Sequence, residues 1–357
     1  MLHRSNRILL LFAALLLVLT AAQCVTPVPQ VIEKEVVVTR EVEKQVFVEP
    51  DYVTFRTNWL FSGIHAWVFY GREKGFFKEQ NIVLDIREGN GSGNVVRTVI
   101  NKGDDFALVS TGNPIVSIAQ GAPIKLIYTW IGAFGWGYLC RPESGVKVAK
   151  DLEGKIIVSS PGNAGLNYHP LFIQRAGLDP AKMQDLTLVD AGAMVSTVLA
   201  GKADCELGGV ADHLPYWIKE GKEPVVIYLE SPETGVWGPA TGAITHQDMI
   251  NNNPDLVKRM VAALYKSQVE CEKDVEGCVQ ALLNAHPMKD KDTETLALKI
   301  SMSTWYGPNQ KCLGQFVPEN WEAAINLIRN APESPIKDDT KPVEAFFDAS
   351  FLPPCEK

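Results

Sequence analysis

The chain has 357 residues, with 34 Lys and Arg against 42 Asp and Glu, a formal net charge of −8 at pH 7 and a mean hydropathy of −0.01. This acidic balance argues against a nucleic-acid partner, because such partners are held mainly by clustered Lys and Arg. After residue 23 no apolar run is long enough to cross a membrane, which argues against a channel or a permease.

The first 23 residues predict an export signal. A basic start is followed by an unbroken apolar run from Ile8 to Leu19. Cys24, directly after this region, is typical of a lipoprotein in which the cysteine carries the lipid anchor. Gln23 departs from the small residue that usually precedes such a cysteine, so simple cleavage nearby or a retained anchor stays open. Residues 24–50, rich in Glu, Lys and Val, predict a tether too polar to fold alone.

From residue 51 onward, short apolar segments alternate with amphipathic ones. Strands that alternate with helices of about 10–15 residues indicate mainly parallel sheets covered by helices on both faces. The expected strands are 53–57, 83–87, 107–109, 124–128, 156–158, 186–189, 225–229 and 240–245. Residues after 254 are expected to be mainly helical. We predict one lobe from 51–135 with 236–357, and a second lobe, 136–235, inserted into it.

An internal repeat at an offset of 99 residues connects the two lobes. Residues 93–100, followed by 105–108, match residues 192–199, followed by 204–207, with Gly, Val, Thr, Asp and Leu in register. Each copy predicts a short helix, a polar turn and a buried strand. The repeat predicts two lobes of related plan whose equivalent helix N-termini face each other across a cleft. Chance similarity of two ordinary helix–turn–strand units is the alternative.

Seven cysteines are present. An even number beyond Cys24 indicates disulfides in an exported chain, with their connectivity open. These are Cys140, Cys205, Cys271, Cys278, Cys312 and Cys355. The spacing of Cys271 and Cys278 suits one short loop, whereas free buried thiols are the alternative for Cys140 and Cys205. No spacing matches a zinc site, and no metal or cofactor is expected.

Several short motifs resemble a known family. They are Asn58-Trp59 with His65-Ala66, Glu73-Lys74-Gly75-Phe76-Phe77, Ala119 to Ile124, and Lys150 to Lys155. Together they resemble the periplasmic binding proteins of ABC importers, in the branch that captures thiamin pyrimidine precursors, riboflavin, aliphatic sulfonates and nitrate. The resemblance implies a two-lobe α/β fold of the type II-like class, each lobe a doubly wound sheet, with hinge closure on the ligand. These motifs identify the family better than the ligand.

Ligands of open α/β sheets bind beyond the carboxyl ends of the strands. The loops expected there are rich in aromatic and small polar side chains and, apart from Arg56, contain no Lys or Arg. Aromatic faces stack on flat ligands, and carboxylates accept hydrogen bonds from amines and ring N–H groups. The candidate ligand-binding residues are Asn58, Trp59, Phe61, His65, Glu88, Asn90, Ser92, Thr111, Asn113, Trp136, Asn163, Tyr168, Asp190, Asp212, Tyr216 and Trp237. Core or hinge packing is the alternative for each aromatic, a solvated strand end for Glu88, and a structural hydrogen bond for His65.

We therefore predict an extracytoplasmic lipoprotein, anchored to the cell membrane, that captures a flat heteroaromatic vitamin or precursor. It would deliver this ligand to an ABC permease driven by a cytoplasmic ATPase. Riboflavin is favoured, a thiamin aminopyrimidine precursor is the close competitor, and an alkanesulfonate or nitrate is the further alternative. A ligand-sensing domain for a membrane partner also stays open.

Enzyme activity is not expected from the sequence. Pyrimidine synthases resemble these binders but use a cysteine-rich CCCFC motif, which this chain lacks. No GxSxG motif, P-loop or Ser/His/Asp set occurs either.

Overall fold

The structure is a computed structural model that describes residues 49–133, 135–230 and 234–355. The predicted export signal, Cys24 and nearly all of the predicted tether lie outside these residues. Within them, no helix combines the length and the apolar character that a membrane span requires.

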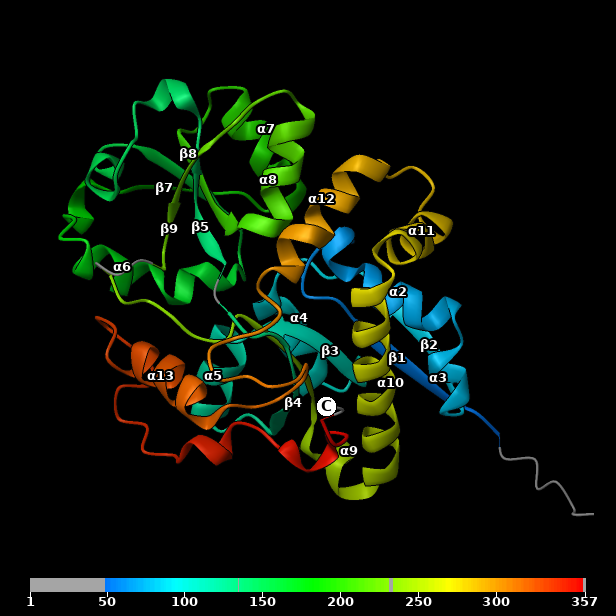
Figure 1. The fold of residues 1–357 in the computed structure, drawn as a ribbon. Helices are drawn as coiled ribbons and strands as arrows, with labels where there is room; N and C mark the ends of the chain where they lie inside the picture. The colour runs from blue at the N-terminus through cyan, green and yellow to red at the C-terminus, as the bar shows by residue number, and fades with distance from the viewer. Residues whose placement is uncertain (1–48, 134, 231–233, 356–357) are drawn as a thin grey trace, which may run out of the picture. The chain divides into compact units, whose positions relative to one another are not determined.

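The first sheet has five strands in the order β2-β1-β3-β10-β4 (Figure 1). β1 pairs in parallel with β2 and β3, whereas β10 runs antiparallel to both β3 and β4. All five residues of β3 are buried, as expected for a strand covered by helices on both faces. The strands are β1 (Asp51–Arg56), β2 (Ile82–Arg87), β3 (Phe106–Ser110), β4 (Ile124–Ile131) and β10 (Thr241–His246).

The second sheet repeats this plan in the order β7-β6-β8-β5-β9. β6 pairs in parallel with β7 and β8, and β5 runs antiparallel to β8 and β9. The strands are β5 (Trp136–Cys140), β6 (Ile156–Ser159), β7 (Gln184–Thr187), β8 (Cys205–Gly209) and β9 (Val225–Tyr228). The predicted two-lobe α/β fold with mainly parallel sheets is confirmed. β5 was not among the expected strands, because its Trp-Gly-Tyr-Leu-Cys sequence lies where the chain crosses between the lobes.

The 99-residue repeat corresponds to equivalent elements of the two sheets. α4 (Ser92–Ile100) leads into β3, and α7 (Met194–Leu199) leads into β8. β3 pairs in parallel with β1, through Phe106 opposite Phe55, and β8 pairs in parallel with β6, through Cys205 opposite Ile157. The start of α4 faces a loop of the second lobe, because the Gly93 amide donates to the carbonyl of Gly162 at 3.1 Å.

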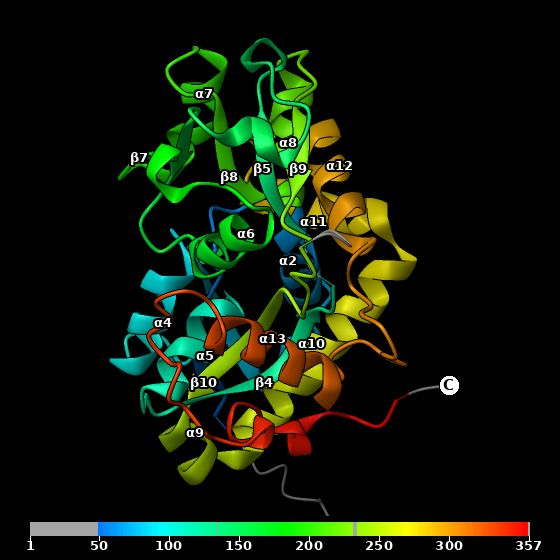
Figure 2. The ribbon, with the colours of Figure 1, turned by 90° about the vertical axis from the view of Figure 1, so that its left-hand side faces the viewer.

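Helices cover the sheets and extend the first lobe toward the second (Figures 1 and 2). α10 and α11 pack on α2, α13 packs on α5, and α12 packs on α8 of the second lobe. The remaining helix beside the second sheet is α6 (His169–Arg175). The helices named here are α2 (Ala66–Glu73), α5 (Gly112–Ala119), α8 (Val210–Lys219), α10 (Pro254–Lys273), α11 (Val275–Ala285), α12 (Lys291–Met302) and α13 (Pro318–Arg329); short α3 (Phe76–Glu79) and α9 (Gln247–Asn252) complete the set.

Three disulfides join the six cysteines of the described ranges. Cys140–Cys205 links directly paired positions of β5 and β8. Cys271–Cys278 links the end of α10 to α11, and Cys312–Cys355 ties down the C-terminal segment. The predicted short loop is therefore confirmed, and the free-thiol alternative for Cys140 and Cys205 is wrong, because their strands are neighbours in the sheet.

Candidate functional site

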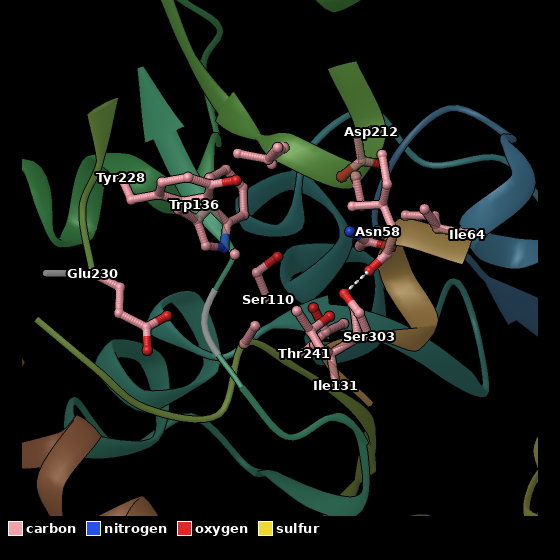
Figure 3. Close-up of a pocket in the computed structure, with 17 residues that line it drawn as sticks. Asn58, Ile64, Ser110, Ile131, Trp136, Asp212, Tyr228, Glu230, Thr241 and Ser303 are labelled. Carbon is pink, nitrogen blue, oxygen red and sulfur yellow. Dashed lines mark hydrogen bonds between the residues drawn. The ribbon is translucent and has the colours of Figure 1, made fainter. Parts of the chain in front are cut away.

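Three adjoining cavities lie where the carboxyl ends of strands from both sheets meet. The first, here called the inner cavity, has a volume of about 190 Å³ and is drawn in Figure 3. It is lined from the loop after β1, the ends of β3, β4, β8 and β9, the start of β10 and the end of α12. Its lining includes Asn58, Ile64, Ser110, Ile131, Trp136, Asp212, Tyr228, Glu230, Thr241 and Ser303.

A second, small cavity of about 10 Å³, here called the constriction, shares Asn58 and Trp136 with the inner cavity and Trp59 and His213 with a larger one. The larger one, here called the outer cavity, has a volume of about 650 Å³. Trp59 lines both the constriction and the outer cavity, and Asp212 lines all three spaces. The position of the cavities agrees with the general rule that ligands bind beyond the strand carboxyl ends in such sheets.

One wall of the inner cavity is aromatic. Trp136 begins β5 and Tyr228 ends β9, its neighbour in the sheet, and the Leu229 amide donates to the Trp136 carbonyl at 2.9 Å. Both side chains line the inner cavity. Aromatic faces of this kind favour a flat ligand, with about 0.5–1.5 kcal/mol per stacked pair beyond the area that is buried.

Two carboxyl groups face the inner cavity. Asp212 lies in the first turn of α8, and burial raises its pKa to about 6, although the neighbouring His213 opposes this shift. Its Oδ1 is buried without a hydrogen-bond partner within the described part of the chain. Burial also raises the pKa of Glu230, which follows β9. The described residues that line the inner cavity include no Lys, Arg or His.

Asn58 and His65 form a buried pair at the edge of the same cavity. Asn58 is 6% exposed, His65 is fully buried, and His65 Nε2 lies 2.9 Å from Asn58 Oδ1. The backbone N–H of Ser62 points at His65 Nδ1 at 3.3 Å. Burial and, second, the nearby Lys289 lower the pKa of His65 to about 3, so the ring is neutral.

The turn after β2 holds the loop that carries Asn58. The Gly91 and Gly89 amides donate to the carbonyls of Asn58 and Trp59, at 3.1 and 3.2 Å. The Phe61 amide donates to Glu88 Oε1 at 2.6 Å. A Cβ on Gly89 would lie 2.0 Å from the carbonyl oxygen of Thr57, so only glycine allows this close approach. Glu88 therefore fixes the backbone of the loop while it also borders the outer cavity.

Trp59 reaches from this loop into the second lobe. Its ring centroid lies 5.8 Å from that of His213. Glu206, fully buried on β8, bonds both His213 Nδ1 at 2.9 Å and Trp217 Nε1 at 2.7 Å. Burial alone would lower the pKa of His213, but the adjacent Glu206 raises it above its ordinary value. An imidazole paired with a buried carboxylate therefore lines the constriction.

The candidate residues divide into two groups in the structure. Those lining one of the three cavities are Asn58, Trp59, Phe61, Glu88, Ser92, Trp136, Asn163, Asp212 and Tyr216. The others, His65, Asn90, Thr111, Asn113, Tyr168, Asp190 and Trp237, lie outside these spaces.

Several of these side chains have structural partners that the sequence did not reveal. Asn163 donates to the Leu207 carbonyl at 2.7 Å and accepts from the Gly165 amide at 2.9 Å, so both ends of its amide are used. Thr111 donates to the Pro239 carbonyl at 2.5 Å and contacts the Tyr168 hydroxyl at 3.3 Å. Asp190 caps the turn before α7 through the Gly192 amide.

Sequence reasoning missed several residues of the site. Tyr228 lies near the end of the predicted strand 225–229 and Glu230 follows it, so the rule of strand ends could have found them. Ser303 and Thr304 at the end of α12 also line the inner cavity, but they are distant in sequence and carry no local signal. His213, which lines the constriction, has the spacing of an ordinary helix residue.

Comparison with known proteins adds a family and a fold. The profile of the family described as NMT1/THI5 like matches residues 63–274, more than half of the chain. The 4-amino-5-hydroxymethyl-2-methylpyrimidine phosphate synthase THI12 of Saccharomyces cerevisiae is 26% identical over 160 residues, which is 44% of this chain and 46% of the synthase. The chain thus spans about half the length of the curated relatives it matches first.

Solved structures share the fold, among them the two that follow. The alkanesulfonate-binding protein SsuA from Xanthomonas axonopodis pv. citri, bound to MOPS, has a TM-score of 0.64 and 14% identity over 84% of this chain and 99% of its own. The Candida albicans CA3427 gene product has a TM-score of 0.63 and 15% identity over 86% of this chain and 99% of its own. The latter exhibits the generic periplasmic binding protein fold, and this chain has that fold too.

Proposed function

Because this chain belongs to the NMT1/THI5-like family, we propose that it is a solute-binding protein of an ABC importer. It captures a small, flat nitrogen heterocycle in the inner cavity and delivers it to a membrane permease. The observation that carries this proposal is the lining of that cavity: the aromatic side chains of Trp136 and Tyr228, the carboxyl groups of Asp212 and Glu230, and no cationic side chain within the described lining.

An aminopyrimidine matches this lining best. A protonated carboxyl group can donate to a ring nitrogen and accept from the adjacent amino group, which makes two hydrogen bonds to one edge of the ring. With a pKa of about 6, Asp212 can share such a proton near neutral pH. The volume of about 190 Å³ suits a single ring, since sites for drug-sized ligands occupy about 300–1,000 Å³.

Riboflavin, favoured by the sequence, is the second candidate. Its larger ring system would have to extend past Trp59 into the outer cavity, where aromatic and polar side chains are also present. A sulfonate or nitrate is disfavoured, although SsuA binds such an anion, because anion sites usually present a basic side chain and the inner cavity offers acids.

A binding role is favoured over synthesis. The curated relatives are synthases, but this chain lacks the cysteine-rich motif that resemblance associates with them. Its six cysteines in the described ranges are all joined in disulfides, which leaves no thiol there for chemistry.

Three disulfides also support residence in an oxidising compartment. We further propose that the protein is exported and anchored to the membrane through Cys24, and that its lobes are residues 51–135 with 236–357 and residues 136–235. Replacing Cys24 by Ala in the full chain is expected to move the protein from the membrane fraction to the medium or the periplasm. Unchanged membrane association would contradict lipid anchoring and leave the binding role to be judged separately.

The test of the binding role is calorimetric titration of the full chain, purified in detergent, with three ligands. They are 4-amino-5-hydroxymethyl-2-methylpyrimidine, riboflavin and MOPS. Micromolar or tighter binding of the pyrimidine alone supports the proposal. Binding of riboflavin alone would reject the aminopyrimidine and support riboflavin, the ligand that the sequence favours. Binding of MOPS alone would show that the site accepts a sulfonate despite its acidic lining.

A further inference from the structure

The pair formed by Asn58 and His65 sets the direction of one hydrogen bond in the inner cavity. Backbone N–H groups can only donate, so Ser62 N, 3.3 Å from His65 Nδ1, requires that this ring nitrogen be an acceptor. In a neutral imidazole the proton then sits on Nε2. Nε2 lies 2.9 Å from the side chain of Asn58 and must donate to it.

The orientation of the Asn58 amide follows from this donor. Only its carbonyl oxygen can accept from His65 Nε2, so the amide nitrogen points the other way. Asn58 lines both the inner cavity and the constriction. Its backbone is held in place by the Gly91 amide, which donates to the Asn58 carbonyl at 3.1 Å. The Asn58 amide nitrogen is therefore available as a hydrogen-bond donor to a ligand in the cavity. Figure 3 shows Asn58 at the cavity wall.

The second lobe contributes a hydrogen-bond acceptor, Asp212, to the same cavity. Asp212 Oδ1 is buried and has no hydrogen-bond partner among the residues that the structure describes. A buried carboxyl oxygen without a partner is costly unless a ligand satisfies it. The two groups line the same cavity, one from the loop after β1 and one from the first turn of α8.

We propose that His65 is a positioning residue that selects ligands with a hydrogen-bond acceptor on the edge facing Asn58, in addition to the group that bonds Asp212. The proposal deepens the proposed function and rests on it for the identity of the ligand. His65 itself touches no ligand, because it is fully buried behind Asn58.

The experiment has one arm without ligand. In the full chain, nitrogen-15 NMR of the histidine rings, assigned by comparison with His65→Gln, reports the protonation state and tautomer of His65. We expect a neutral ring protonated at Nε2 throughout the range pH 5–8 in which a free imidazole titrates. A ring protonated at Nδ1, or one that becomes charged within this range, would overturn the inference whatever the ligand proves to be.

The second arm measures discrimination between two ligands. One is 4-amino-5-hydroxymethyl-2-methylpyrimidine, and the other is the aniline of the same shape, whose ring has CH in place of both nitrogens. We expect His65→Phe and Asn58→Asp to weaken binding of the pyrimidine by about tenfold and that of the aniline by less than about threefold. His65→Gln, which keeps an N–H donor, should restore part of the discrimination.

Matched variants separate positioning from stability. His169→Phe replaces another buried histidine, whose Nδ1 lies 2.7 Å from the Tyr138 hydroxyl and which lies outside the three cavities. It should leave the ratio of the two affinities unchanged. An equal loss for both ligands in His65→Phe would assign His65 a purely structural role. If the unaltered protein binds neither ligand, the proposed function fails and the selection by His65 fails with it, while the NMR arm still decides the orientation of Asn58.

Discussion

The two lobes share a strand order but contribute different chemistry to the cavity between them. The first lobe contributes neutral hydrogen-bonding groups, such as Asn58, Ser110 and Thr241. The second contributes the carboxyl group of Asp212 and, on strands next to each other, Trp136 and Tyr228. Because the two sheets have the same strand order but different cavity-lining residues, we infer that ligand specificity is determined by the residues at the strand ends and not by the sheets.

The sheets also differ in how they are secured. Strands of the first sheet have 5 to 8 residues, and those of the second have 4 or 5. The shorter sheet carries a disulfide between two of its own strands, Cys140–Cys205. The lobe that contributes most of the aromatic and acidic groups is thus the one whose sheet is cross-linked.

The largest effect is expected from removing that cross-link. Replacing Cys140 and Cys205 by Ala opens a loop with a sequence separation of 65, against 7 for Cys271 and Cys278. Chain entropy then predicts a loss of about 4 kcal/mol in the free energy of unfolding, against about 2.5 kcal/mol for the Cys271/Cys278 double variant. Denaturant unfolding of both variants measures this, and an equal loss would contradict the entropic explanation.

Next in size is the loss of the aromatic wall. Trp136→Ala should weaken ligand binding roughly 100-fold, which is about 2–3 kcal/mol, because both stacking and buried area are lost. Trp237→Ala is the matched control, since Trp237 lies outside the three cavities. Titration calorimetry compares the two. Similar losses in both variants would mean that the second lobe contributes stability and not ligand contact.

A smaller effect is expected on the pH dependence of the free energy of unfolding. The pKa of Asp212 is about 6 in the folded protein against an ordinary 3.8, so the folded state binds the extra proton between these values. Its contribution to stability therefore rises as the pH falls from 8 toward 4. Asp212→Asn should remove this contribution and be about 1–2 kcal/mol more stable at pH 8. Thermal unfolding of both proteins from pH 5 to 8 checks this, and parallel curves would contradict it.

The smallest effect is expected in the first lobe. Glu88→Ala removes the acceptor for the Phe61 amide and should weaken ligand binding about threefold, because one net hydrogen bond that orders the loop is lost. Amide hydrogen exchange at Phe61 should accelerate at the same time. Weaker binding without faster exchange would place Glu88 in direct contact with the ligand.

The sequence predicted the sheets better than the site. Strands buried on both faces are mostly apolar runs, so β3, β4 and β6 could be located from the sequence alone. β5 could not, because its glycine and aromatic residues fit a crossing segment equally well. Trp136 was found because it lies at the predicted crossing between the lobes, and Asp212 because it follows the buried strand that the internal repeat predicts.

Side-chain partners limited the prediction of the site. Asn163 lies in the expected cleft loop and has a polar side chain, but its side-chain amide is hydrogen-bonded to the backbone of Leu207 and Gly165. His65 was a candidate ligand-binding residue, yet it is fully buried and bonded to Asn58. Ser303 reaches the cavity from α12, which packs on α8, and such a tertiary contact leaves no periodic pattern in the sequence.

The antiparallel strand in each sheet has a consequence for the history and the folding of the chain. β1 to β4 form one set and β6 to β9 an equivalent set, yet the strand that follows each set enters the other set's sheet, between its third and fourth strands. This is the arrangement of two similar halves that have exchanged their final strand, as in a domain-swapped dimer fused into one chain. Neither half can complete its own sheet alone. A chain cut in the crossing between β4 and β5 should therefore yield two fragments that fold only when mixed.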